Sequence, residues 1–318
     1  MSVTVLSGGV GAARFLSGLL AVVSESDVTA IVNTGDDTDL HGLSISPDLD
    51  TIVYTLAGAI DPERGWGLAD ETWRAMEALA RYAEVRPGES AAAPTWFNLG
   101  DQDLATHFYR TARLAEGATL TQVTDEIARA WGLGLNVLPM SDDRFRTLVT
   151  LAETGDEISF QDYFVRLRHG EAVSSIRFDH DHASLTVEAE LALATADTIV
   201  VAPSNPLVSI GPIRALPGVD ETLASRRDRV VAVSPIVGGA AVKGPADRML
   251  RELGMEPSVI GVAKLYAPIA SVLVIDPVDA HLADAVESVG IDCLVAPSIM
   301  STQERARSLA QVCLDAVS

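Results

Sequence analysis

The sequence predicts an α/β protein with a doubly wound, mostly parallel sheet and a mainly helical insertion. Short apolar runs with the length of buried strands recur along the chain, and helical segments separate most of them. This alternation is typical of parallel sheets that carry helices on both faces. Glycine, small and polar residues follow four of the predicted strands. Because the carboxyl ends of parallel strands share one edge of the sheet, we expect a ligand-binding crevice there.

The chain begins with a strand, a glycine-rich turn and a helix. Val3–Leu6 is the predicted strand, Gly8, Gly9 and Gly11 lie in the turn, and Ala12–Val23 is the predicted helix. Glycine lets a ligand approach the main chain, and free N–H groups at a helix N-terminus attract anions. The spacing G-G-x-G departs from the dinucleotide-binding pattern GxGxxG. We interpret the turn as a phosphate loop, with a tight turn that binds no ligand as the alternative.

The second predicted strand, Val28–Val32, leads into a segment rich in carboxylates. After Asn33, the segment contains the aspartates Asp36, Asp37, Asp39, Asp48 and Asp50. Carboxylates so close together repel one another, and a divalent cation removes the repulsion. Mg²⁺ in particular binds one or two carboxylates together with the phosphates of a substrate. A solvated acidic loop is the alternative. A helix is expected from Thr51, and Asp50 or Thr51 would then be its cap.

Composition changes beyond this helix. Between Asp61 and Tyr163 the spacing of apolar residues is mostly helical, and no convincing parallel strand appears before Arg146–Leu151. We interpret this segment as an insertion that covers the carboxyl ends of the core strands. The predicted division places the core in residues 1–58 and 185–318 and the insertion in residues 59–184.

Four later strands complete the predicted core: Thr198–Ala202, Arg229–Ser234, Val272–Asp276 and Asp292–Ala296. Ser204 and Asn205 follow the first of them, and Gly238 follows the second. Lys243 comes next and is the candidate cation for a phosphate, with a solvated surface lysine as the alternative. The final helix is expected over Ser301–Ala316, with Ser301 as its N-cap.

Composition and charge exclude several classes of protein. The chain has 318 residues, of which 48% are hydrophobic, so a large core can be buried. The net charge of -21 argues against nucleic acid and anionic membranes as partners, because both require clustered Lys and Arg. Cys293 and Cys313 are expected to be reduced thiols, as in the cytoplasm. The sequence shows no secretory signal and no apolar run of about 18 residues that would span a bilayer.

Seven motifs carry a resemblance to a known family. In chain order they are GGVGAARFL, NTGDD, SPDLDT, LAGAIDPERGWG, LGDQDLATH, APSNPLVSIGPI and SPIVGG. Together they resemble the 2-phospho-L-lactate transferase family of deazaflavin coenzyme biosynthesis, whose actinobacterial members are phosphoenolpyruvate transferases. The match covers almost the whole chain. It implies a Rossmann-like core with a helical insertion.

The resemblance implies an Mg²⁺-dependent enzyme of the phosphotransferase class in coenzyme F-420 biosynthesis. Such an enzyme moves a phosphoenolpyruvyl, phospholactyl or phosphoglyceryl group from a guanosine diphosphate-linked donor to the deazaflavin Fo (7,8-didemethyl-8-hydroxy-5-deazariboflavin). GMP is released, and the product is coenzyme F-420-0 or its dehydro form. The sequence leaves the identity of the acid open. A homodimer is the expected assembly for a soluble enzyme of this type.

The resemblance also assigns roles to individual residues. Asp50 is the first candidate for a metal ligand and Asp36 the second, while Asp37 and Asp48 would orient a hydroxyl or the metal-bound water. Substrate binding is expected from Gly8, Gly9, Gly11, Asn33, Asp48, Asp61, Asp101, Ser204, Asn205, Ser209, Gly238 and Lys243. The motif LGDQDLATH departs from the family pattern, because Gln102 stands where a basic residue is expected.

Two other functions use the same features. An NAD-dependent dehydrogenase would use the glycine turn for its cofactor and Asp36 for a ribose, but the glycine spacing and the additional carboxylates count against it. A non-catalytic regulatory protein would bind a guanine nucleotide in the same crevice without turnover.

Overall fold

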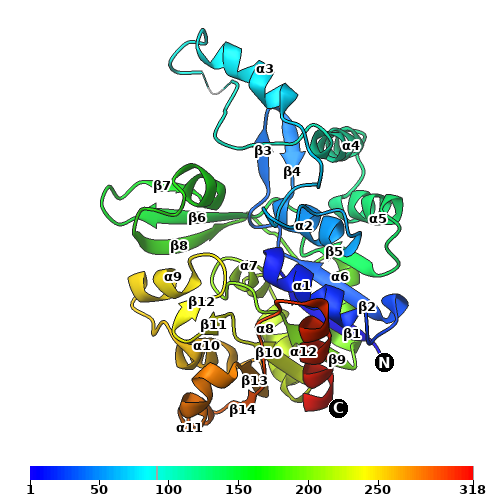
Figure 1. The fold of residues 1–318 in the computed structure, drawn as a ribbon, viewed down its shortest axis with the longest axis vertical. Helices are drawn as coiled ribbons and strands as arrows, with labels where there is room; N and C mark the ends of the chain where they lie inside the picture. Colours follow the sequence, from blue (N-terminus) through cyan, green and yellow to red (C-terminus); the bar gives the residue numbers. More distant parts are fainter. Residues whose placement is uncertain (91, 318) are drawn as a thin grey trace.

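The computed structural model describes residues 1–90 and 92–317. Its centre is a seven-stranded parallel sheet with the strand order β14-β13-β10-β9-β1-β2-β5 (Figure 1). The strands are β1 (Val3–Ser7), β2 (Val28–Val32), β5 (Asn136–Pro139), β9 (Thr198–Val201), β10 (Val230–Val233), β13 (Val272–Ile275) and β14 (Asp292–Val295). The predicted α/β fold with a parallel sheet is confirmed.

The direction of strand addition reverses beside β1. From β1 the chain moves to β2 and β5 on one side, and it later returns to β9 on the other side before β10, β13 and β14. Val3 of β1 is therefore in register with Val28 of β2 and with Thr198 of β9. The loops that follow β1 and β9 leave the sheet in opposite directions, and a crevice opens between such loops in doubly wound sheets.

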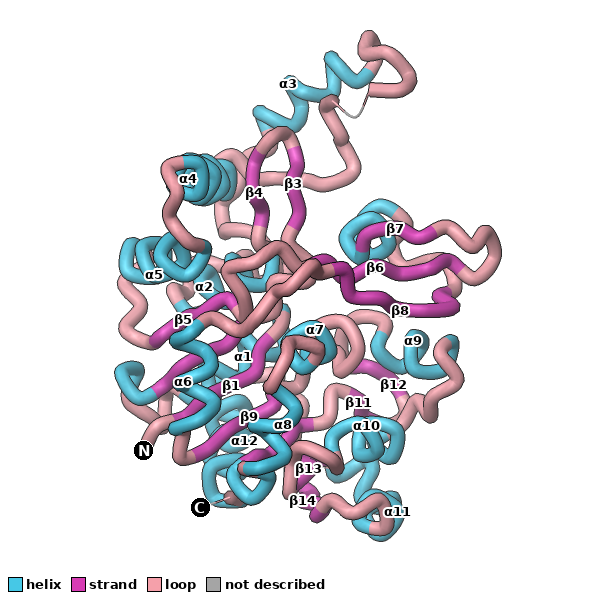
Figure 2. Tube along the Cα trace, turned by 180° about the vertical axis from the view of Figure 1, so that it is seen from behind, coloured by secondary structure: helices cyan, strands magenta, loops and turns pink. Residues whose placement is uncertain are grey.

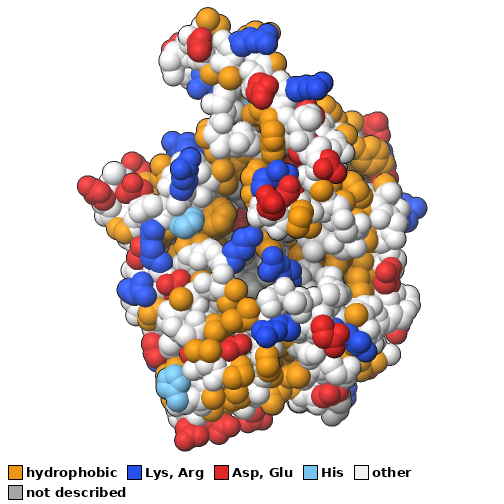
Figure 3. All heavy atoms as spheres, in the orientation of Figure 1, with side chains coloured by type: hydrophobic (Ala, Val, Ile, Leu, Met, Phe, Trp, Pro, Cys, Tyr) orange, Lys and Arg blue, Asp and Glu red, His pale blue; other side chains and the backbone are white. Residues whose placement is uncertain are grey.

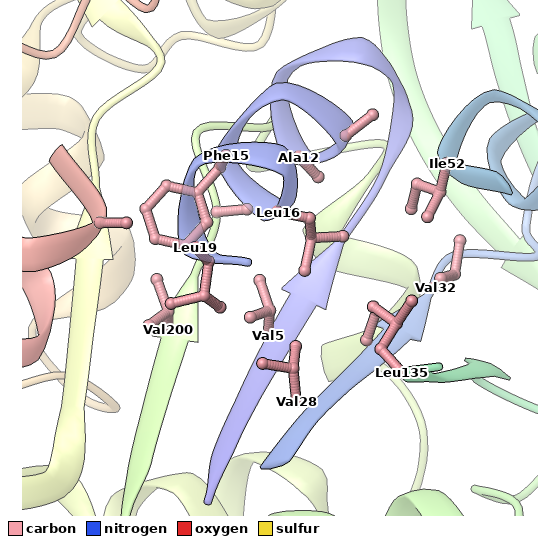
Figure 4. Packing of buried hydrophobic residues seen from close by; sticks show 14 of the residues in the cluster. Val5, Ala12, Phe15, Leu16, Leu19, Val28, Val32, Ile52, Leu135 and Val200 are labelled. Carbon is pink, nitrogen blue, oxygen red and sulfur yellow. The ribbon is translucent and has the colours of Figure 1, made fainter. Parts of the chain in front are cut away.

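Helices cover both faces of this sheet. One face carries α1 (Gly9–Leu19), α2 (Pro47–Leu56), α5 (Leu120–Ala130) and α12 (Gln303–Ala316). The opposite face, seen in Figure 2, carries α6 (Val187–Thr195), α7 (Ile210–Arg214), α8 (Val219–Ser225), α10 (Val259–Tyr266) and α11 (Ala283–Glu287). Figure 4 shows how Phe15 and Leu16 of α1 pack over Val5 and Val200 of neighbouring strands. Full burial of each such side chain stabilises the fold by about 1.5–3 kcal/mol.

The segment between α2 and α6 contains more strands than predicted. β5 is the edge strand of the central sheet, and β6 (Arg146–Leu151), β7 (Glu157–Ser159) and β8 (Val173–Asp179) form a separate antiparallel sheet. The expectation that no parallel strand appears before Arg146–Leu151 is therefore wrong at β5, which pairs parallel with β2, while the strand at Arg146–Leu151 itself pairs antiparallel. A run of four residues ending in proline is too short for periodicity to separate a strand from a loop.

The remaining elements surround the carboxyl edge of the sheet. They are β3 (Thr38–Leu40), β4 (Leu43–Ile45), α3 (Arg74–Ala83), α4 (Asp103–Ala115), β11 (Ile236–Val237), β12 (Ala240–Ala241) and α9 (Ala246–Glu252). In Figure 1, α3 and the hairpin of β3 and β4 project beyond this edge, and the sheet of β6 to β8 lies beside them. The hairpin forms within the aspartate-rich segment, which the sequence presents only as a loop.

Two predicted helix caps lie at other residues. α2 begins at Pro47 with Ser46 at its N-cap, so Asp50 lies within the first turn and does not cap the helix. At α12 the cap is Thr302, whose hydroxyl accepts a hydrogen bond from the backbone N–H of Arg305.

Cys293 and Cys313 are free thiols, as predicted. No helix in the described part of the chain is long and apolar enough to cross a membrane.

Candidate active site at the carboxyl edge of the sheet

A cavity of about 630 Å³ lies at the carboxyl edge of the sheet. Loops that follow β1, β9, β10 and β14 line it from the core, and α2, α4 and the inserted segment close it from the other side. On the face shown in Figure 3, the surface is hollowed in the middle and basic side chains gather around the hollow. The predicted site residues that line the cavity are Gly8, Gly9, Gly11, Asp36, Asp48, Asp50, Ser204, Asn205, Ser209 and Lys243.

The floor of the cavity is the contact between the glycine turn and the loop after β9. Ser204 Oγ donates a 2.7 Å hydrogen bond to the carbonyl oxygen of Gly8. A Cβ atom added at Gly11 would lie 2.2 Å from the carbonyl oxygen of Pro203, so only glycine fits this close approach. The N-terminus of α1 is thereby held at the point where strand addition reverses, and its N–H groups are suited to an anion.

Replacing Gly11 with alanine is expected to lower the free energy of unfolding by about 1–3 kcal/mol, because the two backbones must move apart. Urea unfolding measures this difference. Gly88→Ala is the matched control, since a Cβ there meets no atom within 4 Å. Equal stability of the two variants would contradict the close packing of the floor.

Asp36 and Asp48 form one group of carboxylates beside the glycine turn. The side-chain amide of Asn33 donates to Asp36 Oδ2 at 3.2 Å and to Asp48 Oδ2 at 3.0 Å, so one amide holds both carboxylates. Asp37 lies next to them outside the cavity lining and accepts a 2.6 Å hydrogen bond from Ser46 Oγ. Asn33 and Asp37 therefore support the cavity wall from behind.

Within the described residues, no ion pair joins Asp36, Asp37 or Asp48 to a basic side chain. Burial, and then repulsion from Asp48 and Asp37, raise the pKa of Asp36, and burial raises the pKa of Asp48 to about 6. Burial also raises the pKa of Asp37. Asp36 Oδ1 and Asp37 Oδ1 are buried, and neither atom has a hydrogen-bond partner in the described part of the chain. A divalent cation fits this group, because it supplies the missing counter-charge and prefers oxygen ligands.

Asp50 belongs to a second buried group, which is centred on α4. Arg110 is buried, and its guanidinium binds both oxygens of Asp50, with Nη1 3.1 Å from Oδ2. Nη1 also donates to His107 Nδ1 at 3.3 Å, and His107 Nε2 lies 3.3 Å from Asp103 Oδ2. Because a guanidinium can only donate, Nδ1 of His107 accepts, and the ring proton is assigned to Nε2. Tyr54 completes the group by donating a 2.7 Å hydrogen bond to Asp103.

The two predicted metal ligands therefore lie in different groups. One ligand atom each from Asp50, Asp103 and His107 lie within 4.8 Å of one another, as in a metal site. Arg110 already neutralises Asp50, however, and a cation beside it would be repelled by the guanidinium. Among the described residues no basic side chain pairs with Asp36 or Asp48, so this group is the better candidate for Mg²⁺.

Aromatic side chains form the wall away from the sheet. Trp66, Trp96 and Phe97 line the cavity from the projecting segment, and Phe160 and Phe164 line it from the segment beside β7. The rings of Trp96 and Phe97 pack edge to face with centroids 5.7 Å apart, and those of Phe160 and Phe164 are stacked at 5.5 Å. Such a wall suits a flat aromatic ligand.

Basic side chains reach the cavity from the core. Arg14 of α1 and Lys243, which follows β12, both line it and are both exposed. Partial desolvation at the cavity wall lowers the pKa of Lys243, and the charge of Arg14 lowers it further. Neither charged group forms a hydrogen bond or an ion pair within residues 1–90 and 92–317.

Four other residues named from the motifs do not line the cavity. Asp61 accepts backbone N–H groups of Glu63 and Arg64, and Asp101 accepts those of Arg74 and Ala75 at the start of α3. The N–H of Gly238 donates to Asp279. The side chain of Gln102 donates to the carbonyl oxygen of Asp70 at 3.2 Å. In this structure these residues bind neighbouring backbone or side chains.

Several lining residues were absent from the sequence-based candidates. They are Arg14, Tyr54, Trp66, Trp96, Phe97, Asp103, His107, Phe160 and Phe164. One signal was available: Asp103, His107 and Arg110 have the i, i+4, i+7 spacing that places side chains on one face of a helix. No local pattern indicates that this face turns toward Asp50.

In fold and site, the protein is a Rossmann-like α/β protein that brings a glycine turn, buried carboxylates and free cations to one crevice, as enzymes acting on phosphorylated substrates do. The sequence pattern of the 2-phospho-L-lactate transferase CofD family matches residues 3–308. The chain belongs to this family, as its motifs predicted.

Relatives with high coverage support the same assignment. A phosphoenolpyruvate transferase of Kitasatospora aureofaciens is 43% identical, over 99% of this chain and 97% of the relative. A phosphoenolpyruvate transferase of Mycobacterium tuberculosis is 40% identical, over 95% of this chain and 94% of the relative. A solved UPF0052 family member from Bacillus halodurans superposes with a TM-score of 0.63 at 15% identity, covering 98% of each chain, and supports the fold.

Proposed function

We propose that the protein transfers a phosphoenolpyruvyl, phospholactyl or phosphoglyceryl group from a guanosine diphosphate-linked donor to the deazaflavin Fo in coenzyme F-420 biosynthesis. Family membership and the names of the relatives support a transferase of such a group. The observation that carries the proposal further is the layout of this crevice. It combines buried carboxylates, an anion-binding floor and an aromatic wall.

The layout suggests where each substrate lies. The diphosphate of the donor would rest on the N-terminus of α1, with its guanosine toward the loop of Ser204 and Ser209 after β9. The flat deazaflavin ring would lie against the aromatic wall, where Phe160 and Phe164 are stacked. The ribityl chain would then extend toward the carboxylates.

Asp36 and Asp48 are the residues that would hold Mg²⁺. When bound, the ion would neutralise charge on the phosphoryl oxygens and bring the two substrates together. Asn33 would keep the two carboxylates aligned through its amide, which donates to both. Asp37, one residue further, would add negative charge behind them.

The reaction is a substitution at phosphorus. The oxygen of a ribityl hydroxyl forms a bond to the distal phosphorus of the donor, and the bond between this phosphorus and the bridging oxygen breaks. GMP leaves with the bridging oxygen and its electron pair, and the hydroxyl proton passes to a carboxylate or to water. Positioning and charge stabilisation supply most of the rate in such transfers.

Asp50 is the carboxylate that would orient the attacking hydroxyl. It lines the cavity, and the guanidinium of Arg110 fixes both of its oxygens. The second lone pair on each oxygen remains available to accept a hydroxyl proton. His107 in turn fixes Arg110, and Asp103 fixes His107.

Incubation of the protein with Fo, Mg²⁺ and each guanosine diphosphate-linked donor tests the proposal. Chromatography should show GMP and a fluorescent F-420-0 product in equal amounts, and removal of the metal with EDTA should stop both. Donors of the three acids, compared by kcat/KM, identify the acid that is transferred. Nucleotide binding without product from any donor would contradict the proposal.

Phe164→Ala is expected to weaken Fo binding about tenfold. The reason is that a nucleic-acid base stacked on an aromatic side chain gains about 1–3 kcal/mol, and the flat deazaflavin ring would stack in the same way. The affinity for GDP should not change. Fluorescence titration of Fo measures the effect. Phe108→Ala is the control, since Phe108 is also exposed but does not line the cavity. Equal loss of Fo affinity in both variants would remove the aromatic wall from the Fo site.

A further inference from the structure

The aromatic wall extends past the cavity to a third ring. Phe160 and Phe164 line the cavity and are stacked, and the imidazole of His169 is stacked on Phe164 with ring centroids 5.3 Å apart. His169 itself lies outside the cavity lining. We refer to the rings of Phe160, Phe164 and His169 as the ring stack. The position of Phe164 in the cavity therefore depends on where the backbone places His169.

The backbone that carries the ring stack has an unusual conformation. Asp162–Arg166 form a π-helical turn, a rare structure that is found mostly at functional sites. Beyond it, Arg168 has a φ of 51° and His169 a φ of 42°, in the left-handed region that residues with side chains rarely adopt. Two such residues in succession persist only where surrounding contacts hold them. Contacts from elsewhere in the chain must therefore fix this turn.

Arg248 of α9 makes such contacts. Its guanidinium donates hydrogen bonds to the carbonyl oxygens of His169 and Glu171. It also donates to the phenolic oxygen of Tyr163 at 3.3 Å. A guanidinium presents its donors in a planar fork, so one side chain fixes several oxygens at once. The left-handed turn is thus held from the side that faces α9.

Glu252 completes the contact one turn further along α9. It accepts a hydrogen bond from Arg248 Nε at 2.6 Å and another from the backbone N–H of Val173 at 2.9 Å. Val173 begins β8, so the two side chains hold the chain on both sides of Glu171. Met249, which follows Arg248, is fully buried in one apolar cluster with Phe160.

The helix α9 is a fixed base for these contacts. Figures 1 and 2 show α9 beside β8. Ala246 and Leu250 belong to the apolar core on one face of the central sheet, whereas Met249 belongs to the cluster of the small sheet β6 to β8. The helix therefore joins the core to the segment that carries the ring stack.

We propose that Arg248 is a positioning residue for the deazaflavin, because it holds Phe164 where the flat ring of Fo stacks. This inference rests on the proposed transfer, which takes Fo as the ligand of the aromatic wall. Arg248 lies outside the cavity lining and acts through the ring stack. Without its guanidinium, the turn at His169 relaxes to commoner backbone angles and Phe164 loses its place in the wall.

Arg248→Met keeps the apolar part of the side chain and removes the hydrogen-bond donors. Its affinity for Fo should fall about tenfold, the loss expected for Phe164→Ala. The KM for Fo should rise by a similar factor while kcat at saturating Fo changes little, since the lost interaction is present in substrate and transition state alike. The affinity for GDP should stay at the wild-type value.

A double-mutant cycle shows whether Arg248 acts through Phe164. In the background of Phe164→Ala, adding Arg248→Met should weaken Fo binding no further, because the ring that Arg248 positions is already gone. Independent contributions would instead multiply. A role in general stability would lower the affinities for Fo and GDP together.

Fluorescence titration with Fo and calorimetric titration with GDP, on the full-length protein and these variants, test the inference. Arg251→Met is the control on the same helix, since its side chain is 58% exposed and lies 3.8 Å from Asp247. Wild-type Fo affinity in Arg248→Met, or losses that multiply in the double variant, would overturn the inference. If urea unfolding shows that Arg248→Met is not folded, Arg248→Lys replaces it. This variant keeps the charge beside Glu252 but not the planar fork, and the same outcomes decide.

Hydrogen exchange without any ligand separates this inference from the proposed function. Backbone amides of residues 160–173 should exchange faster in Arg248→Met than in the wild type. Faster exchange there in a protein whose wild type does not bind Fo would contradict the transfer and leave Arg248 as the residue that holds the turn. Product formation together with wild-type Fo affinity in Arg248→Met would contradict the inference alone.

Discussion

Replacing Asp36 with asparagine is expected to lower kcat/KM for transfer at least about 100-fold, because loss of one group that organises transition-state charge typically costs that much. Asparagine keeps the shape of the side chain and can still accept the hydrogen bond from Asn33. It removes one negative charge from beside Asp48 and Asp37, whose repulsion raises the pKa of Asp36. The fold should therefore be as stable as the wild type in the absence of metal.

Thermal unfolding with and without Mg²⁺ gives a second measure of the same variant. A cation that binds only the folded protein raises the melting temperature as its concentration exceeds the dissociation constant. This rise should occur in the wild type and be absent in Asp36→Asn. Asp39→Asn is the control, because Asp39 belongs to the same segment but is exposed on β3. An Mg²⁺-dependent rise of normal size in Asp36→Asn would remove this residue from the metal site.

Arg110→Met is expected to lower the free energy of unfolding by about 3–5 kcal/mol, the usual cost of leaving one member of a buried ion pair without its partner. Arg110 is among the largest fully buried side chains of the protein, and Asp50 has no other cation at this distance in the described part of the chain. Asp50 would also lose its fixed orientation. Transfer should therefore fall even at temperatures where the variant remains folded.

A double-mutant cycle separates these two effects. In Arg110→Met with Asp50→Leu, both charges are removed, and much of the lost stability should return while transfer does not. Arg113→Met is the control on the same helix, since its pair with Glu126 is partly exposed and should contribute less than about 1 kcal/mol. Urea unfolding measures the destabilisation. If Arg110→Met and Arg113→Met lower the free energy of unfolding equally, the proposed contribution of the buried pair is contradicted.

The parts of the site that the sequence predicts are those that depend on neighbouring residues. The strand β1, the glycine turn and the helix α1 follow one another within a short stretch, and so do β2 and Asp36. Their hydrophobic pattern and turn residues suffice to place them at the carboxyl edge of a parallel sheet. Asp48 lies near them because α2 begins one residue before it.

The parts that the sequence does not reveal depend on contacts between distant segments. Asp50 and Arg110 are 60 residues apart, and nothing in either local pattern shows that α4 turns its charged face toward α2. The position of β5 likewise depends on its pairing with β2. Asp101, where substrate binding is predicted, likewise shows contacts that its motif does not reveal, because its carboxylate accepts backbone N–H groups of α3.

Titration of Fo into the folded protein, followed by the fluorescence of the deazaflavin, tests the central proposal that one crevice holds both substrates and the metal. The titration is repeated with GDP, with Mg²⁺ and with both together. Saturable binding that GDP and Mg²⁺ strengthen is the predicted result, because the nucleotide and the ion complete the surface that the ribityl chain meets. Absence of Fo binding under all four conditions, in a sample whose cooperative unfolding shows that it is folded, would contradict the proposed transferase.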